Sequence, residues 1–182
     1  ASSVFAAGGK QSLPNPDFTK GGKIPAGADH DWTLGATGAR GWMSSDMKPI
    51  YDTRIVGRAA TALMRPVLRN DTRKYPNHLL EILDQAAPGS VLVYVMEDGL
   101  EIAAMGNLMA TTAKARGLAG AVIDGAVRDI TELRRMGFPA WSRRVSPATS
   151  VGRMVSVDKQ IPVICGGAAL THAQRGMPGK PP

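Results

Sequence analysis

The chain has 182 residues, of which 43% are hydrophobic and 5% aromatic, and this suits one domain with an aliphatic core. Its formal charge of +7 makes anionic small molecules or nucleic acid candidate partners. The basic residues are scattered along the chain, however, so solvated surface charge is the favoured interpretation and nucleic acid is not expected as a partner.

Single features of the sequence argue against a disulfide, a zinc site, a membrane span and a signal peptide. Cys165 is the only cysteine, which excludes an internal disulfide, and the apolar run before it predicts a core thiol rather than a nucleophile. The three histidines lack the spacing of a zinc site. No apolar run is long enough to span a bilayer and no signal peptide is recognisable. A cytoplasmic protein without a membrane partner is therefore expected.

Taken in chain order, the sequence begins with a segment that has no apolar periodicity. Residues 1–30 are rich in Gly, Pro, Ser and Lys, and we expect an extended or flexible N-terminal arm. A contact of this arm with a neighbouring subunit is the functional alternative. Further along, helices are predicted within residues 31–43, 77–85, 107–116 and 130–135. Strands are predicted over residues 54–62, 90–96, 102–105, 119–123, 140–143, 152–157 and 161–163.

The alternation of these strands and helices predicts the class of fold. It favours an α/β fold with a central, largely parallel sheet, in a single domain over residues 31–170. The nearly uniform apolar run at 90–96 indicates a strand that is buried on both faces. Residues 171–182 do not resemble a strand and are expected to form an atypical C-terminal tail.

The segment from Gly106 to Asp129 contains the residue types of a small-molecule site. Gly106 follows a predicted strand and permits close approach of a ligand, and free N–H groups at the start of the next helix can bind anions. Arg128 offers a planar fork for a carboxylate, and Asp129 offers a hard oxygen for a divalent cation. Taken singly these residues have plainer interpretations. Asp124-Gly125 predicts a turn, and Asp129 could cap the helix that begins near Ile130.

The whole stretch from Ala104 to Pro147 is more specific than its parts. Its sequence Gly106-Asn107-Leu108-Met109, followed by Asp124-Gly125-Ala126-Val127-Arg128-Asp129, closely resembles the RraA-like family. That family contains class II 4-hydroxy-4-methyl-2-oxoglutarate / 4-carboxy-4-hydroxy-2-oxoadipate aldolases and the regulator of ribonuclease activity A. The resemblance covers about residues 31–168. It implies a swivelling β/β/α-type sandwich that assembles as a homotrimer or a hexamer, with active sites between subunits.

The resemblance also implies a role for each matching residue. In the aldolase branch, the arginine matching Arg128 holds the pyruvyl carboxylate and stabilises the enolate. Backbone amides matching Leu108 and Met109, next to Gly106, hold the same carboxylate, and the aspartate matching Asp129 is the direct ligand of Mg²⁺ or Mn²⁺. The implied activity is that of a divalent-metal-dependent, pyruvate-forming lyase. It would cleave 4-hydroxy-2-oxo dicarboxylic acids by a retro-aldol reaction, decarboxylate oxaloacetate, or do both.

Two features of this chain depart from the aldolase pattern. Asn107 stands where aldolases have Asp or Glu, a carboxylate that orients or deprotonates a metal-bound water. An amide can hydrogen-bond that water but cannot take its proton near neutral pH, so Asn107 is expected to reduce or redirect catalysis. After Gly166-Gly167 the chain also lacks the family's usual Pro-Gly-Asp turn. The alternative function is therefore a non-catalytic RraA-type protein that binds and regulates an endoribonuclease.

Overall fold

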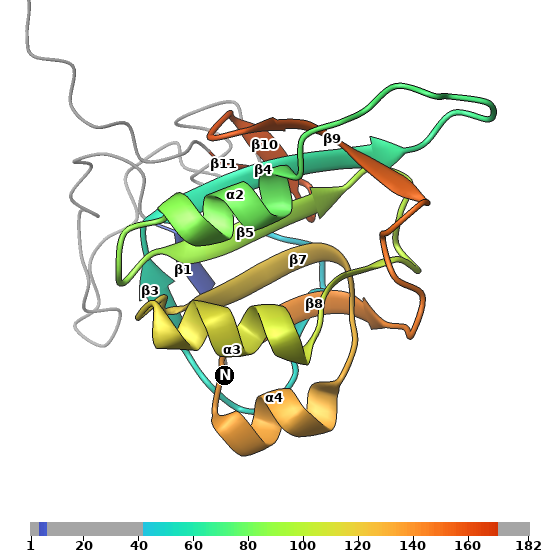
Figure 1. Cartoon of the computed structure of the whole chain (residues 1–182). Helices are drawn as coiled ribbons and strands as arrows, with labels where there is room; N and C mark the ends of the chain where they lie inside the picture. Colours follow the sequence, from blue (N-terminus) through green and yellow to red (C-terminus); the bar gives the residue numbers. More distant parts are fainter. Residues whose placement is uncertain (1–3, 7–41, 171–182) are drawn as a thin grey trace, which may run out of the picture.

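The computed structural model describes residues 4–6 and 42–170, and a seven-stranded sheet lies at its centre (Figure 1). The strand order is β2–β8–β7–β5–β4–β9, and β6 pairs with β7. The bounds are β2 Lys48–Pro49, β4 Ala59–Pro66, β5 Val91–Met96, β6 Ala103–Met105, β7 Gly120–Val127, β8 Ala140–Val145 and β9 Met154–Lys159. Strands β4 to β8 pair in parallel, and only the edge strands β2 and β9 are antiparallel. The predicted central, largely parallel sheet is confirmed.

Three helices of the described residues lie on one face of this sheet (Figure 1). They are α2 (His78–Gln85), α3 (Asn107–Ala115) and α4 (Ile130–Met136), and they confirm the helices predicted at 77–85, 107–116 and 130–135. Each helix connects two parallel strands, as parallel pairing requires. Helix α2 starts where the side chain of Asn77 accepts a hydrogen bond from the amide of Leu80 at 3.2 Å. The helix predicted within 31–43 falls mainly on residues 31–41, which lie outside the described residues.

Strand β5 separates two apolar layers, as expected for a strand buried on both faces. Leu92 and Tyr94 pack in the cluster that includes the buried faces of the three helices. Val91 and Val93 belong to a second cluster on the opposite side of the sheet, together with Ile55. Alternate residues of a strand point to opposite faces, so one six-residue segment contributes to both layers.

The second layer consists of two small strand pairs. Strand β1 (Val4–Ala6) pairs in parallel with β3 (Ile55–Gly57), and β10 (Val163–Cys165) pairs with β11 (Ala168–Leu170) as an antiparallel hairpin. Together with the central sheet and the helices, these pairs give the layer order β/β/α. Cys165 is fully buried in this layer, and its burial raises the pKa of its thiol. The prediction of a core thiol is confirmed.

The turn predicted at Asp124-Gly125 is wrong, because both residues lie inside β7. Two partners compensate the carboxylate of Asp124 in this position: the guanidinium of Arg143 donates to it at 3.1 Å, and the amide of Gly166 donates at 2.6 Å. Gly125 is required for packing, since a Cβ there would lie 2.6 Å from the side chain of Met96. The strand predicted at 119–123 therefore continues to Val127.

The C-terminal strands also differ from the prediction. The strand expected at 161–163 is displaced to β10, because the hydroxyl of Thr61 donates to the carbonyl of Ile161 at 2.6 Å and holds that residue outside the strand. Gly166 and Gly167 have positive φ values of 55° and 84°, which form the turn to β11, a strand that the sequence did not predict. The predicted arm at 1–30, apart from β1, and the tail at 171–182 lie outside the described residues. None of the three described helices could cross a bilayer.

Candidate active site

The ends of two neighbouring parallel strands bring the candidate site residues together. Arg128 and Asp129 directly follow β7, and Gly106 directly follows β6, its parallel neighbour. The amide of Arg128 donates to the carbonyl of Met105 at 3.0 Å, which ties the two strand ends to each other. The carboxyl ends of parallel strands lie at the same edge of a sheet, where ligands of open α/β sheets commonly bind.

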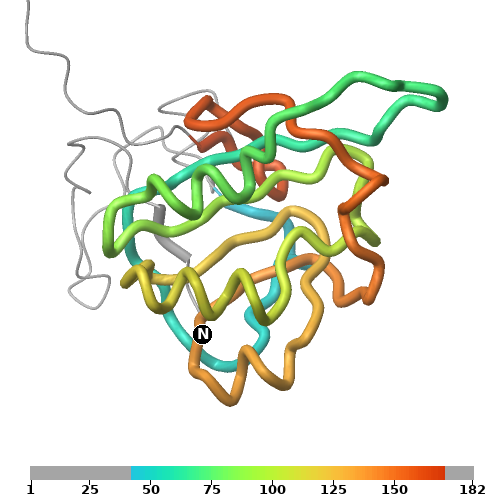
Figure 2. Tube along the Cα trace, viewed as in Figure 1, coloured from blue at the N-terminus to red at the C-terminus, as the bar shows by residue number. Residues whose placement is uncertain are grey.

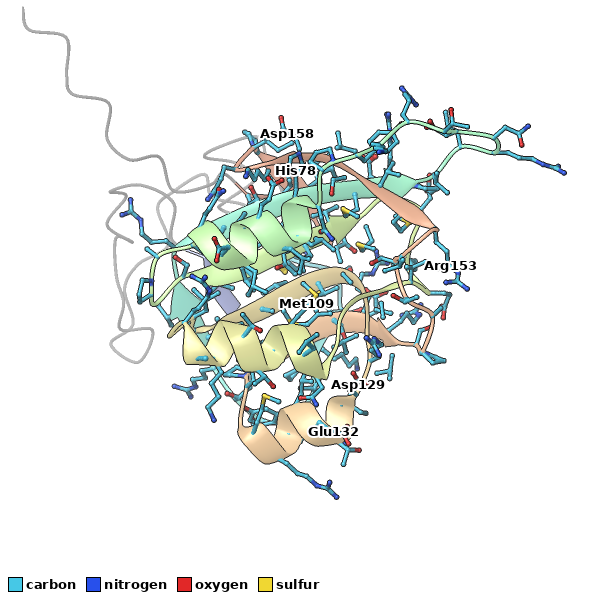
Figure 3. All side chains as sticks on the ribbon, viewed as in Figure 1. His78, Met109, Asp129, Glu132, Arg153 and Asp158 are labelled. Atoms are coloured by element: carbon cyan, nitrogen blue, oxygen red, sulfur yellow. The ribbon has the colours of Figure 1, made fainter. Side chains whose placement is uncertain are left out.

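Asp129 contacts the start of helix α3 rather than capping α4. One of its carboxylate oxygens, Oδ2, accepts a hydrogen bond from the amide of Asn107 at 2.9 Å and lies 3.5 Å from the guanidinium of Arg128. Its side chain makes no capping hydrogen bond to α4, although Asp129 occupies the residue before that helix. The interpretation of Asp129 as a side-chain cap of the helix at Ile130 is therefore wrong. Figure 3 shows Asp129 next to the N-terminal end of α3.

The backbone of Asp129 adopts the left-handed conformation, with φ 59° and ψ 37°. Non-glycine residues seldom adopt this conformation, and Asp and Asn are among those that tolerate it best. The conformation turns the chain sharply from β7 into α4 while the side chain points back toward α3. Backbone strain of this kind is concentrated at functional sites.

Gly106 permits the close approach of the two charged side chains. A Cβ at this position would lie 2.6 Å from Oδ2 of Asp129 and 2.9 Å from both Cγ and Nε of Arg128. The backbone of Gly106 is extended (φ −139°), so the requirement for glycine here is one of space and not of conformation. Any side chain at this position would displace Arg128 and Asp129 from the start of α3.

We expect Gly106→Ala to disturb the site more than the fold. Overpacking of this kind costs typically about 1–3 kcal/mol, and the groups that must move are Arg128 and Asp129. Thermal unfolding should show a moderate loss of stability. Under the metal-binding role that the resemblance implies for Asp129, titration with Mn²⁺ should show a larger loss of affinity. A variant with unchanged Mn²⁺ affinity would contradict the expectation that space at Gly106 positions Asp129 as a metal ligand.

The other predicted site residues form the first turn of α3. Asn107 is its first residue, and its side-chain oxygen accepts a hydrogen bond from the hydroxyl of Thr111 at 3.2 Å. The amides of Leu108 and Met109 have no acceptor within the described part of the chain, as is usual for the first turn of a helix. The side chain of Leu108 is 79% exposed. The two free amides and the Arg128 guanidinium therefore lie together at the start of α3. This corner of the molecule, formed by the first turn of α3 and by Arg128 and Asp129 after β7, suits an anionic ligand.

A cavity of about 340 Å³ adjoins this corner. Gly106, Leu108, Met109 and Arg128 line it, whereas Asn107 and Asp129 do not. Its remaining walls come from within residues 75–80, at the start of α2, from within residues 149–156, which include the start of β9, and from Met64 of β4 and residues 103–105 of β6. The segment between β4 and α2, which projects from the body of the molecule, meets residue 153 through a hydrogen bond of 2.9 Å between Val67 and Arg153 (Figure 2). No motif in the sequence indicated these walls.

The residues present fit a divalent cation that has a single protein ligand. Only Oδ2 of Asp129 has partners within the described residues, which leaves Oδ1 able to coordinate, and the side chain is 32% exposed. No cluster of three His, Cys, Asp or Glu side chains suitable for a metal occurs within residues 42–170. Mg²⁺ usually keeps several waters and needs only one or two carboxylates, so this donor set suits it better than it suits zinc.

A comparison with models of protein families shows the family of this chain. The model of the RraA-like family, described as Aldolase/RraA, matches residues 28–174. The chain belongs to the RraA-like family. The match covers every described element from β2 to β11, and it confirms the resemblance found in the sequence.

The chain is also similar to individual proteins that have different names. A protein of Halalkalibacterium halodurans named "Putative 4-hydroxy-4-methyl-2-oxoglutarate aldolase" is 29% identical over 133 residues, which are 70% of this chain and 58% of that protein. The crystal structure of RraAS2 from Streptomyces coelicolor, described as an unusual member of the RNase ES inhibitor RraA family, is 26% identical with a TM-score of 0.59. The structural match covers 78% of this chain and 69% of RraAS2. An uncharacterized protein of Pseudomonas syringae has a TM-score of 0.63 at 26% identity, covering 79% and 65% of the two chains.

Proposed function

We propose that this protein is a divalent-metal-dependent, pyruvate-forming lyase. It would cleave 4-hydroxy-2-oxo acids, of which the dicarboxylic ones are the first to test, by a retro-aldol reaction, decarboxylate oxaloacetate, or do both. The observation that supports the proposal is that Arg128, Asp129 and the free amides of α3 share one corner at the mouth of a cavity. The similarity to a protein named "Putative 4-hydroxy-4-methyl-2-oxoglutarate aldolase" supports it as well. By the same resemblance, the protein would assemble as a homotrimer or a hexamer.

Each group at this corner has a distinct chemical task. The Arg128 guanidinium would bind the substrate carboxylate through two parallel hydrogen bonds, and the amides of Leu108 and Met109 would donate to the same group. Asp129 would hold Mg²⁺ or Mn²⁺, which when bound polarises the 2-keto oxygen as a Lewis acid. As charge develops on the enolate, the fixed guanidinium stabilises it without reorganisation.

The reaction breaks the bond between C3 and C4 of the substrate. In retro-aldol cleavage the C4 hydroxyl loses its proton, C4 becomes a carbonyl, and the electron pair of the broken bond forms the enolate of pyruvate. Protonation at C3 then releases pyruvate. In oxaloacetate the same bond breaks with loss of CO₂, and no hydroxyl proton has to be removed.

Pyruvate release tests the proposal directly. The purified chain would be incubated with oxaloacetate and with 4-hydroxy-4-methyl-2-oxoglutarate, each with Mg²⁺ and each with EDTA. We expect release that is faster than in the protein-free control and that EDTA abolishes. Release that is equal to the control with both substrates would overturn the proposed cleavage of dicarboxylic acids and decarboxylation of oxaloacetate.

A non-catalytic regulator of an endoribonuclease is the second candidate. Asn107 in place of the aldolase carboxylate favours it, and one structure 26% identical to this chain is described as a member of an RNase inhibitor family. In this case the protein would slow RNA cleavage by an RNase E-type enzyme at stoichiometric concentration, and Arg128→Lys would leave that inhibition unchanged.

We expect Asn107→Asp to raise retro-aldol turnover and to flatten its dependence on pH. An amide cannot accept the C4 hydroxyl proton, so the wild-type rate should be low at pH 7 and should rise with pH. An added carboxylate would accept that proton. A negative charge at the start of α3 is also favourable for the helix, so the fold should be retained.

The matched measurements are pH–rate profiles of cleavage and decarboxylation for wild type, Asn107→Asp and Asn107→Ala. Decarboxylation should change little, because it needs no base. Cleavage that is unchanged or slower in Asn107→Asp would show that the site operates around the amide and would contradict the proton-acceptor assignment.

A further inference from the structure

The cavity next to Arg128 is apolar over most of its wall. Methionine, leucine and alanine side chains from β4, α2, β6 and β9 line it, among them Met64, Leu79, Ala104 and Met154. Arg128 is the single charged residue in the lining formed by the described residues. Figure 3 shows Met109, another lining residue, between α3 and the sheet. The cavity thus has one cationic end and an aliphatic interior, the composition typical of sites for small amphiphilic ligands.

Most of the uncharged polar side chains in the lining already have partners among the described residues, Ser150 being the exception. The Tyr75 hydroxyl donates to Asp71 at 2.6 Å, and the Asn77 oxygen accepts from the amide of Leu80 at 3.2 Å. The Ser156 hydroxyl accepts from the amide of His78 at 3.0 Å. A second carboxylate inside the cavity would lose its hydration and find no second cation among the described lining residues, which is strongly unfavourable.

On this basis, and resting on the proposed function, we propose that the preferred substrate has a single carboxylate and an uncharged aliphatic tail. The substrate is then a 4-hydroxy-2-oxo monocarboxylic acid. Arg128 binds the carboxylate, and the chain beyond C4 enters the cavity. The volume of about 340 Å³ lies in the range of about 300–1,000 Å³ that is usual for small-molecule pockets.

The products follow from the same bond cleavage. When the C3–C4 bond breaks, C4 loses its hydroxyl proton and becomes the carbonyl carbon of an aliphatic aldehyde. The enolate takes up one proton at C3 and leaves as pyruvate, so the reaction needs no oxidant or further reactant. Each methylene that enters the cavity should raise kcat/KM about fourfold, until the cavity is filled.

The experiment compares substrates that differ only in the tail. Pyruvate release would be measured with 4-hydroxy-2-oxohexanoate, 4-hydroxy-2-oxooctanoate and the dicarboxylate 4-hydroxy-2-oxoglutarate. We expect the octanoate to be cleaved fastest and the dicarboxylate slowest. A faster reaction with the dicarboxylate would overturn the inference and leave the lyase proposal standing.

Binding of inert analogues separates this inference from the proposed function. Calorimetry with 4-methyl-2-oxopentanoate and 2-oxoglutarate requires no turnover. Tighter binding of 4-methyl-2-oxopentanoate would support the aliphatic cavity even if no substrate released pyruvate. Equal or tighter binding of 2-oxoglutarate would overturn it whatever the activity.

Two leucine variants show whether the cavity itself sets the preference. Leu80 lines the cavity and is 49% exposed, whereas Leu68 is 63% exposed and does not line it. Leu80→Lys should shift the ratio of kcat/KM values toward the dicarboxylate by about fivefold, the upper end for a partly exposed ion pair. Leu68→Lys adds the same charge and should leave the ratio unchanged. An equal shift in both variants would show that overall charge sets the preference and would contradict the assignment.

Discussion

Asp129→Asn is expected to abolish Mn²⁺ binding and metal-dependent turnover while the fold is retained. The amide oxygen of asparagine can still accept the hydrogen bond from Asn107, and asparagine tolerates the left-handed backbone found at this position. The ion pair with Arg128 is partly exposed, so its loss should change stability by less than about 1 kcal/mol. The substitution therefore removes little except the negative charge. Asp129→Ala would also strain the backbone and leave the Asn107 amide without its acceptor.

The measurements are calorimetric titration with Mn²⁺, pyruvate release and thermal unfolding. Asp158→Asn is the matched control, because Asp158 is exposed and lies at the opposite end of the molecule from Asp129 (Figure 3). The control should retain wild-type metal affinity. If Asp129→Asn also retained it, Asp129 would not be the metal ligand, and its carboxylate would serve only to cap α3.

Most of the fold was predictable because local sequence patterns, each within one helix or strand, indicate its secondary structure. The apolar run at 90–96 and the amphipathic spacing of residues 77–85 predicted β5 and α2 nearly to their ends. Asp124 was assigned to a turn because Asp-Gly usually forms one, and its compensation comes from Arg143 and Gly166, which are distant in sequence. A charged residue in a buried strand becomes acceptable only when such partners are known.

The sequence predicted which residues belong to the candidate site, but it did not predict the contacts between them or the cavity beside them. The sequence placed Gly106, Arg128 and Asp129 at the ends of strands, and the parallel pairing of β6 and β7 explains why those ends meet. The contact between Asp129 and Asn107 spans 22 residues, and no local signal distinguishes it from an ordinary helix cap. The cavity was beyond sequence reasoning, because its walls come from segments near residues 75–80 and 149–156 that meet only in the folded chain.

Arg128→Lys is expected to lower kcat/KM by about a hundredfold or more. The loss of one preorganised donor at a developing oxyanion has an effect of this size. Lysine keeps the positive charge and the attraction to Asp129, but it replaces a rigid planar fork with a single flexible ammonium group. A loss in kcat as well as in KM is expected, because the same guanidinium would meet both the bound carboxylate and the enolate.

Arg135→Lys provides the matched control for this substitution. Arg135 is exposed in the last turn of α4, so the same chemical change is made close to the site but outside the cavity lining. The control should have wild-type kcat and KM. If Arg128→Lys reached within about threefold of wild type, a point charge would suffice at the mouth of the cavity. The carboxylate would then be held mainly by the free amides of α3 and the bound cation, and the geometry of the guanidinium would not limit the rate.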